Sequence, residues 1–145
     1  MLDRPKTPWH LWLVGVVALF WNFGGAFDYY MTQTRNASYM AAFTPEQLEF
    51  FYGFPTWTVA AWAIAVWGAV AGSVLLLLRS RLAVMAFAFS FAGMAVTSFQ
   101  NFVLSEVSMA TLMGPEAMIF SAVIAVSVIF LWWYALRMDR AGVLR

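Results

Sequence analysis

Five polar residues interrupt otherwise apolar stretches of this sequence, and their side chains are of kinds that bind small polar molecules. They are Asn22, Asp28, Thr97, Gln100 and Asn101. Because lipid penalises such groups, a polar residue inside an apolar span is a usual lead to a functional site. If both stretches are membrane helices that end on the same side, these residues lie at a similar depth and form a candidate polar pocket. The structural alternative is a hydrated Asp28 at a helix end, with the other side chains hydrogen-bonding between packed helices.

Further carboxylates are predicted on the same side as Asp28. They are Glu46, Glu49, Glu106 and Glu116. Paired carboxylates could bind a cation or carry out acid–base chemistry. Solvated loop positions and first turns of helices, where acidic groups are favoured, explain most of them.

Other combinations that carry chemistry are missing from the sequence. It contains no cysteine, which excludes disulfide chemistry and thiolate-bound metal centres. His10 is the only histidine and cannot supply two axial haem ligands, and no set of metal ligands shares one depth. No nucleophile lies beside a base. We therefore expect a protein that is not an enzyme, with no catalytic residue, no metal and no cofactor.

The elements that must position these residues are membrane helices. The chain is 63% hydrophobic and only 10% charged, with a mean hydropathy of +0.77, whereas soluble domains carry about 25% charged residues. A bilayer span needs about 20 apolar residues. The sequence predicts one integral membrane domain over 1–145, an all-α four-helix bundle. Its expected spans are 8–30, 55–78, 82–104 and 115–136.

A short additional helix is predicted over 45–52, in the first outer loop. Thr44-Pro45-Glu46-Gln47 combines a cap, a first-turn proline and a capping-box partner, and Gly53 with Pro55 ends the helix. Two turns cannot cross a bilayer. This helix therefore lies flat at the outer interface or tucks over the mouth of the bundle.

Gly68 and Gly72 extend a row of small residues in the second span that begins at Ala61 and Ala65. Small residues at this spacing let two membrane helices approach closely. The contact is either inside the bundle or with a partner.

Charge is sorted between the two sides of these spans. Seven of the eight basic residues lie at the chain ends or in the middle loop: Arg4, Lys6, Arg79, Arg81, Arg137, Arg140 and Arg145. Arg35 alone is predicted opposite, among five of the seven acidic residues. Short loops rich in Lys and Arg stay in the cytoplasm. We expect a bacterial inner membrane protein with both termini cytoplasmic.

Several motifs resemble a family of small four-span inner-membrane proteins of proteobacteria, mostly uncharacterised and sometimes labelled sugar transporters. The motifs are Pro8-Trp9-His10-Leu11-Trp12, Trp21-Asn22, Asp28-Tyr29, Met31-Thr32-Gln33-Thr34, Phe54-Pro55-Thr56-Trp57, the run from Trp67-Gly68 to Arg79-Ser80-Arg81, and Gly142-Val143-Leu144. The resemblance covers nearly the whole chain. It implies a four-span fold and an inner-membrane location, and it assigns no catalytic residue.

Two functions fit this sequence. The first is a non-catalytic accessory or interaction subunit of a larger membrane complex, which agrees with the lack of a charge near the bilayer midplane. The second is a small-solute (sugar-like) transporter or binding protein that works as an oligomer. We expect the lipid bilayer and either a larger complex or a homo-oligomer as partners, and no nucleic acid.

Overall fold

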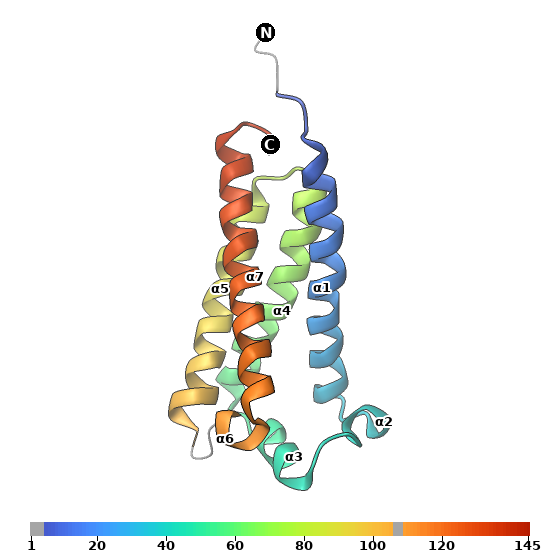
Figure 1. Ribbon diagram of the computed structural model, residues 1–145, viewed down its shortest axis with the longest axis vertical. Helices are drawn as coiled ribbons and strands as arrows, with labels where there is room; N and C mark the ends of the chain where they lie inside the picture. Colours follow the sequence, from blue (N-terminus) through green and yellow to red (C-terminus); the bar gives the residue numbers. More distant parts are fainter. Residues whose placement is uncertain (1–4, 106–108) are drawn as a thin grey trace.

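Four long helices make up most of the protein in the computed structural model, which describes residues 5–105 and 109–145. They are α1 (Trp9–Gln33), α4 (Thr56–Leu77), α5 (Leu82–Phe99) and α7 (Pro115–Arg140), shown in Figure 1. A π-helical turn, η1 (Gln100–Leu104), continues α5. Three short helices complete the described chain: α2 (Ala37–Met40), α3 (Pro45–Tyr52) and α6 (Met109–Met113). The predicted four-helix membrane bundle is confirmed.

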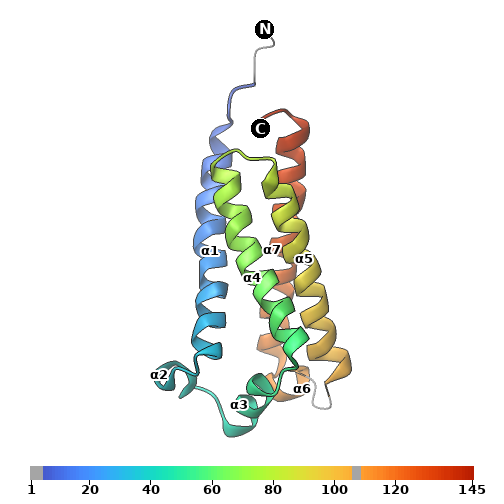
Figure 2. The same ribbon diagram turned by 180° about the vertical axis from the view of Figure 1, so that it is seen from behind.

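The long helices are arranged as a row in which α4 packs on α1 and α5, and α5 packs on α7. Figure 2 shows α4 in front, between α1 and α5, with α7 behind. The start of α1, the α4–α5 turn and the end of α7 lie at one end of the bundle, which we call the termini end. The short helices α2, α3 and α6 lie at the opposite end, called the loop end.

The outward faces of the long helices are apolar. Phe20 on α1, Leu78 after α4 and Ile119 on α7 are 77%, 68% and 66% exposed. Each of the four segments is also long and hydrophobic enough to cross a bilayer, with α5 and η1 forming one span of 23 residues. Water would penalise such a surface, whereas lipid does not. The chain is an integral membrane protein.

The main hydrophobic core lies in the half of the bundle nearest the termini end. It is built from buried residues of all four long helices and the C-terminal segment: Leu11, Ala18, Leu76, Ala83, Phe87, Leu131, Tyr134, Ala135, Val143 and Leu144. In the half nearest the loop end, most of the buried side chains that the structure describes are small or polar, and Met40 is the one large apolar exception. The two halves therefore differ in how their helices are held together.

Helix α7 runs four residues beyond the predicted end at 136, because Arg137 and Arg140 fill its last turn, where cations interact favourably with the helix dipole. Gly142 follows with φ +78°, and Val143 N–H bonds the Met138 carbonyl at 3.0 Å, which is a Schellman motif. This turn directs Val143 and Leu144 into the core. This contact was not predicted from the sequence.

The predicted helix over 45–52 is present as α3 with the same bounds. The Thr44 hydroxyl accepts from Gln47 N–H at 3.2 Å, and the Gln47 side-chain oxygen accepts from Thr44 N–H at 3.0 Å. Figure 1 places α3 beneath the loop end of the bundle, beside α6. Helices α2 and α6 were not predicted.

Candidate functional site

Asn22 joins α1 to α4 in the middle of the bundle. Its side-chain amide donates to Ser73 Oγ at 2.9 Å and to the Ala69 carbonyl at 3.3 Å. Ser73 Oγ in turn donates to the same carbonyl at 2.8 Å, and both polar side chains are buried. The Asn22 amide is therefore directed at α4 and forms a hydrogen-bonded contact between helices.

Asp28 lies near the loop end of α1 and accepts a hydrogen bond from the Tyr39 hydroxyl. Tyr39 belongs to α2, which begins where the Asn36 side chain accepts from Tyr39 N–H at 3.0 Å. Burial of the hydroxyl, together with its contact with Asp28, raises the pKa of Tyr39 to about 12. Tyr39 therefore stays protonated at neutral pH and remains a donor to the carboxylate.

An aromatic cluster surrounds this contact and joins α1, α2, α3 and α4. We call it the loop-end aromatic cluster, and its members are Phe27, Tyr29, Tyr39, Phe43, Phe50, Phe51, Phe54 and Trp62. Most of its pairs meet edge to face, for example Tyr29 and Trp62 with ring centroids 5.0 Å apart. This geometry suits the quadrupole of aromatic rings.

Arg35 makes a cation–π contact next to the loop-end aromatic cluster. Its guanidinium lies 4.3 Å from the centre of the Tyr52 ring and links the end of α1 to α3. Arg35 has φ +51°, a left-handed conformation that residues other than glycine adopt at a cost of the order of 1 kcal/mol. Sequence reasoning missed both the cluster and this contact. The density of aromatic residues between Phe27 and Trp62 was the available signal.

The remaining predicted polar residues lie at the loop end of α5. The Thr97 hydroxyl donates to the Gly93 carbonyl of its own helix at 2.8 Å. Gln100 and Asn101 are half-buried and begin η1, where Ser105 N–H bonds the Gln100 carbonyl at 3.0 Å. Isolated π-helical turns are frequent at functional sites.

The five predicted pocket residues therefore divide between two helices. Asn22 and Asp28 are on α1, whereas Thr97, Gln100 and Asn101 are on α5 and η1, and α4 packs between α1 and α5. The hydrogen bonds of Asn22 and Asp28 lead to different elements. Of the other carboxylates predicted on the side of Asp28, Glu46, Glu49 and Glu116 are exposed, and Glu106 lies outside the described residues. Among the described residues, no three His, Cys, Asp or Glu side chains gather closely enough to hold a metal ion.

Gly68 and Gly72 lie inside the bundle, on the face of α4 that contacts α5. A methyl group added at Gly68 would lie 3.2 Å from the Ala86 carbonyl oxygen, and one at Gly72 would lie 2.7 Å from the Phe87 ring. Gly93 makes the reciprocal approach from α5, with the Ala61 carbonyl oxygen 2.5 Å from the position of a methyl group. The two helices are therefore in contact at backbone level.

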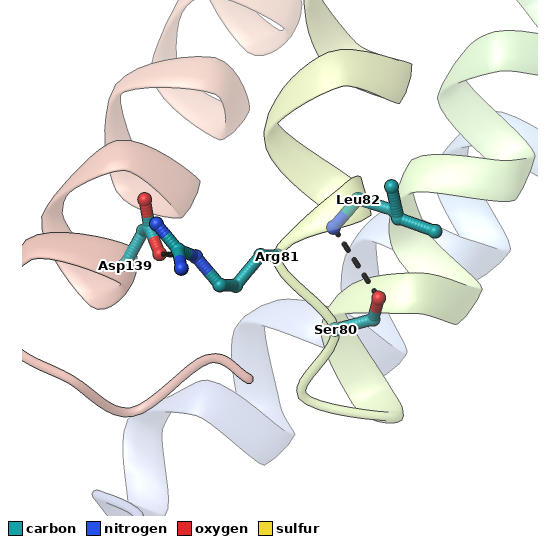
Figure 3. A network of polar contacts seen from close by, with 4 residues as sticks. All are labelled: Ser80, Arg81, Leu82 and Asp139. Carbon is teal, nitrogen blue, oxygen red and sulfur yellow. Dashed lines mark hydrogen bonds and ion pairs between the residues drawn. The ribbon is translucent and has the colours of Figure 1, made fainter.

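Polar contacts at the termini end tie together elements that are distant in sequence. Arg81 Nε lies 2.8 Å from Asp139 Oδ1, which pairs the α4–α5 turn with α7. Figure 3 shows these two side chains beside the hydrogen bond that Leu82 N–H donates to Ser80 Oγ at 3.3 Å. His10 Nδ1 and the Tyr134 hydroxyl are 2.5 Å apart and connect α1 to α7. Arg79 donates to Thr7 Oγ1 at 3.1 Å. The predicted orientation signal at Arg79 and Arg81 is thus also part of the packing.

A groove of about 460 Å³ lies between α1 and α7 on the open side of the row. We call it the α1–α7 groove, and it is lined by Leu13, Val14, Val17, Ala18, Trp21, Val123, Ser127, Phe130 and Leu131. Trp21 Nε1 donates to Ser127 Oγ at 3.1 Å, and Ser127 Oγ donates to the Ile124 carbonyl at 2.7 Å. Both polar groups of the groove are therefore already hydrogen-bonded.

No protein family, curated protein or solved structure matches the chain, so a function can be inferred only from the geometry of the protein itself.

Proposed function

We propose that this integral membrane protein is a non-catalytic accessory or interaction subunit of a membrane protein complex. The observation that carries the proposal is that three of the polar residues predicted to form a pocket make hydrogen bonds within the protein. Asn22 bonds Ser73 and Ala69, Asp28 bonds Tyr39, and Thr97 bonds the carbonyl of Gly93. The Asn22 bonds join two membrane helices, the Asp28 bond joins α1 to α2, and the Thr97 bond lies within α5. They favour a structural role for these groups over solute binding.

The tight contacts of α4 with its neighbours support the same proposal. A methyl group at Gly15 would lie 2.5 Å from Leu77, which brings α1 against α4 near the termini end. The contacts of Gly72 and Gly93 bring α4 against α5 at two further levels. At these three levels the helices are too close for a solute to pass between them. The surfaces available to a partner are the apolar outer faces of the long helices and the short helices α2 and α3 at the loop end.

Site-specific photo-crosslinking in native membranes tests this role. A photoreactive residue in place of Phe20, Phe89 or Ile119 samples the exposed faces of α1, α5 and α7 in turn. We expect one face to give a single adduct with a different protein, while the other two give lipid adducts only and act as matched controls. Purification as a lone protein or homo-oligomer in mild detergent, with no such adduct from any face, would exclude the accessory role.

We further propose that the termini end faces the cytoplasm of a bacterial inner membrane. Lys6, Arg79, Arg81, Arg137, Arg140 and Arg145 support this orientation, because basic residues are retained on the cytoplasmic side. A reporter that is active only outside the cytoplasm should be silent when inserted after Arg81 and active when inserted after Ala42. The reverse pattern would overturn the orientation.

A sugar-like transporter or binding protein working as an oligomer is the second candidate, and Thr58 is the observation that favours it. Thr58 is fully buried at the loop end of α4, and its hydroxyl has no hydrogen-bond partner in the described part of the chain. It lies one turn outward from Ala61, and Thr97 lies one turn outward from Gly93, so the two threonines share a depth. Solute-dependent thermal stabilisation that is lost in Thr58→Val and Asn101→Ala would support transport. Unchanged thermal stability across a panel of sugars would count against it.

A further inference from the structure

The α1–α7 groove presents only carbon to an occupant. Its two polar side chains, Trp21 and Ser127, are bonded to each other, and Ser127 is also bonded to Ile124. A sugar or an ion would lose its hydrogen bonds to water on entering and gain none in return. A hydrocarbon chain loses nothing there, and the groove is open to the surface that faces lipid. The chemistry of the lining therefore selects an acyl chain.

The length of the groove corresponds to one leaflet of a bilayer. On α1 it extends from Leu13 to Trp21, a rise of eight steps or about 12 Å at 1.5 Å per residue. The hydrocarbon core of a bilayer is about 30 Å thick, so each leaflet contributes about 15 Å. Since Leu13 is nearer the termini end, this is the leaflet on the termini side. About one turn beyond that end, the hydrogen bond between His10 and Tyr134 joins α1 to α7.

Basic side chains lie just beyond the end of the groove that is nearest the termini end. Arg137 is two turns from the groove residue Phe130 and therefore on the same face of α7, and it lies 5.5 Å from the centre of the Trp133 ring. Lys6 is exposed just before α1. Neither has an ion pair among the described residues, whereas Arg81 is paired with Asp139. At the opposite end α7 begins with an acidic residue, Glu116. The charges thus favour an anionic group at the termini end only.

We propose that the α1–α7 groove binds one acyl chain of an anionic phospholipid from the leaflet at the termini end. The lipid phosphate then lies against Arg137 and Lys6, while the chain lies along Val17 and Phe130 as far as Trp21. The contact with Trp133 holds the Arg137 guanidinium at the level of the headgroup, where it can pair with the phosphate. This site is independent of the proposed accessory role, since it requires no protein partner.

Native mass spectrometry of the purified full chain in detergent, with phosphatidylglycerol and phosphatidylcholine of identical acyl chains in competition, tests the proposal. We expect the wild-type protein to retain one phosphatidylglycerol in preference to phosphatidylcholine. Arg137→Gln should lower that preference about fivefold, as expected when one basic residue near a membrane surface is removed. Arg145→Gln removes the same charge at the same end, beside the α4–α5 turn, and should leave the preference unchanged.

A second pair of variants tests the groove itself. Val123→Phe fills the groove and should reduce retention of both lipids, whereas Val96→Phe adds the same bulk to an exposed position of α5 and should not. Equal retention of the two lipids by the wild-type protein would overturn the proposal. So would an effect of Arg145→Gln as large as that of Arg137→Gln, or a Val123→Phe protein with unchanged retention. A second protein chain found in the groove in place of lipid would overturn it as well.

Discussion

The termini half of the bundle is held together by buried aliphatic side chains around Phe87, whereas the loop half is held by aromatic rings that meet edge to face across α1, α2, α3 and α4. In the first half most of the contacts come from the long helices, and Val143 and Leu144 of the C-terminal segment add to them. In the second half, many of the contacts come from residues between α1 and α4, such as Phe43 just before α3 and Phe51 within it. Regions with fewer buried apolar contacts open more easily. The fold is therefore fixed mainly at the termini end, and the loop end is where local motion is expected.

Phe87→Ala should give the largest loss of stability, because it empties the centre of the termini-half core. We expect about 2–4 kcal/mol, below the usual cost in a soluble core because lipid is itself apolar. Phe99→Ala, on the exposed face of the same helix, should cost far less. Thermal unfolding in detergent measures both. Equal losses would mean that this core does not dominate stability.

Gly93→Ala should come next, with a loss of about 1–3 kcal/mol from crowding against the backbone of α4. The matched change Gly24→Ala adds the same methyl group where nothing lies within 4 Å, and it should stabilise α1 by up to about 1 kcal/mol. Opposite signs of the shift in unfolding temperature are the expected result. A Gly93→Ala protein as stable as Gly24→Ala would contradict the close approach of α4 and α5.

Asn22→Ala should cost about 0.6–1.7 kcal/mol, the range found for hydrogen bonds between membrane helices. A double-mutant cycle with Ser73→Ala isolates the bond between the two side chains, because Ser73 keeps its own bond to Ala69 in the single variant. The double variant should lose less stability than the two single variants added together. Strictly additive effects would show that the amide contributes only through Ala69.

Tyr39→Phe should have the smallest effect, about 1 kcal/mol, and it should remove a pH dependence confined to the loop half. Because the folded protein raises the pKa of Tyr39 above its ordinary value of 10, the hydroxyl contributes fully below pH 10, and its contribution is lost as the pH rises towards 12. The hydrogen-exchange protection factor of α2, which divides out the base catalysis of exchange at each pH, should therefore fall over that range in the wild-type protein and stay constant in Tyr39→Phe. A fall in both proteins would assign the pH dependence to another group.

The fold could be predicted because lipid imposes long apolar helices, and because Thr44, Gln47 and Gly53 specify the bounds of α3 locally. The candidate site could not be predicted in the same way. Whether Asn22 faces a pocket or α4 depends on the rotation of a nearly uniformly apolar helix, which its sequence does not encode. Arg35, Tyr39 and Tyr134 act through partners brought near by tertiary structure alone, and the α1–α7 groove exists only because those two helices are the ends of the row.

The row of helices also has a consequence for the order of folding. Helices α4 and α5 share the closest contacts and are joined by only four residues, so their pairing has the shortest loop to close. We expect this hairpin to form first, with α1 and α7 then docking on its two edges and bonding to each other through His10 and Tyr134. Pulsed labelling during refolding should protect positions along α4 before those along α7. Earlier protection of α7 would show that the bundle assembles from its edge instead.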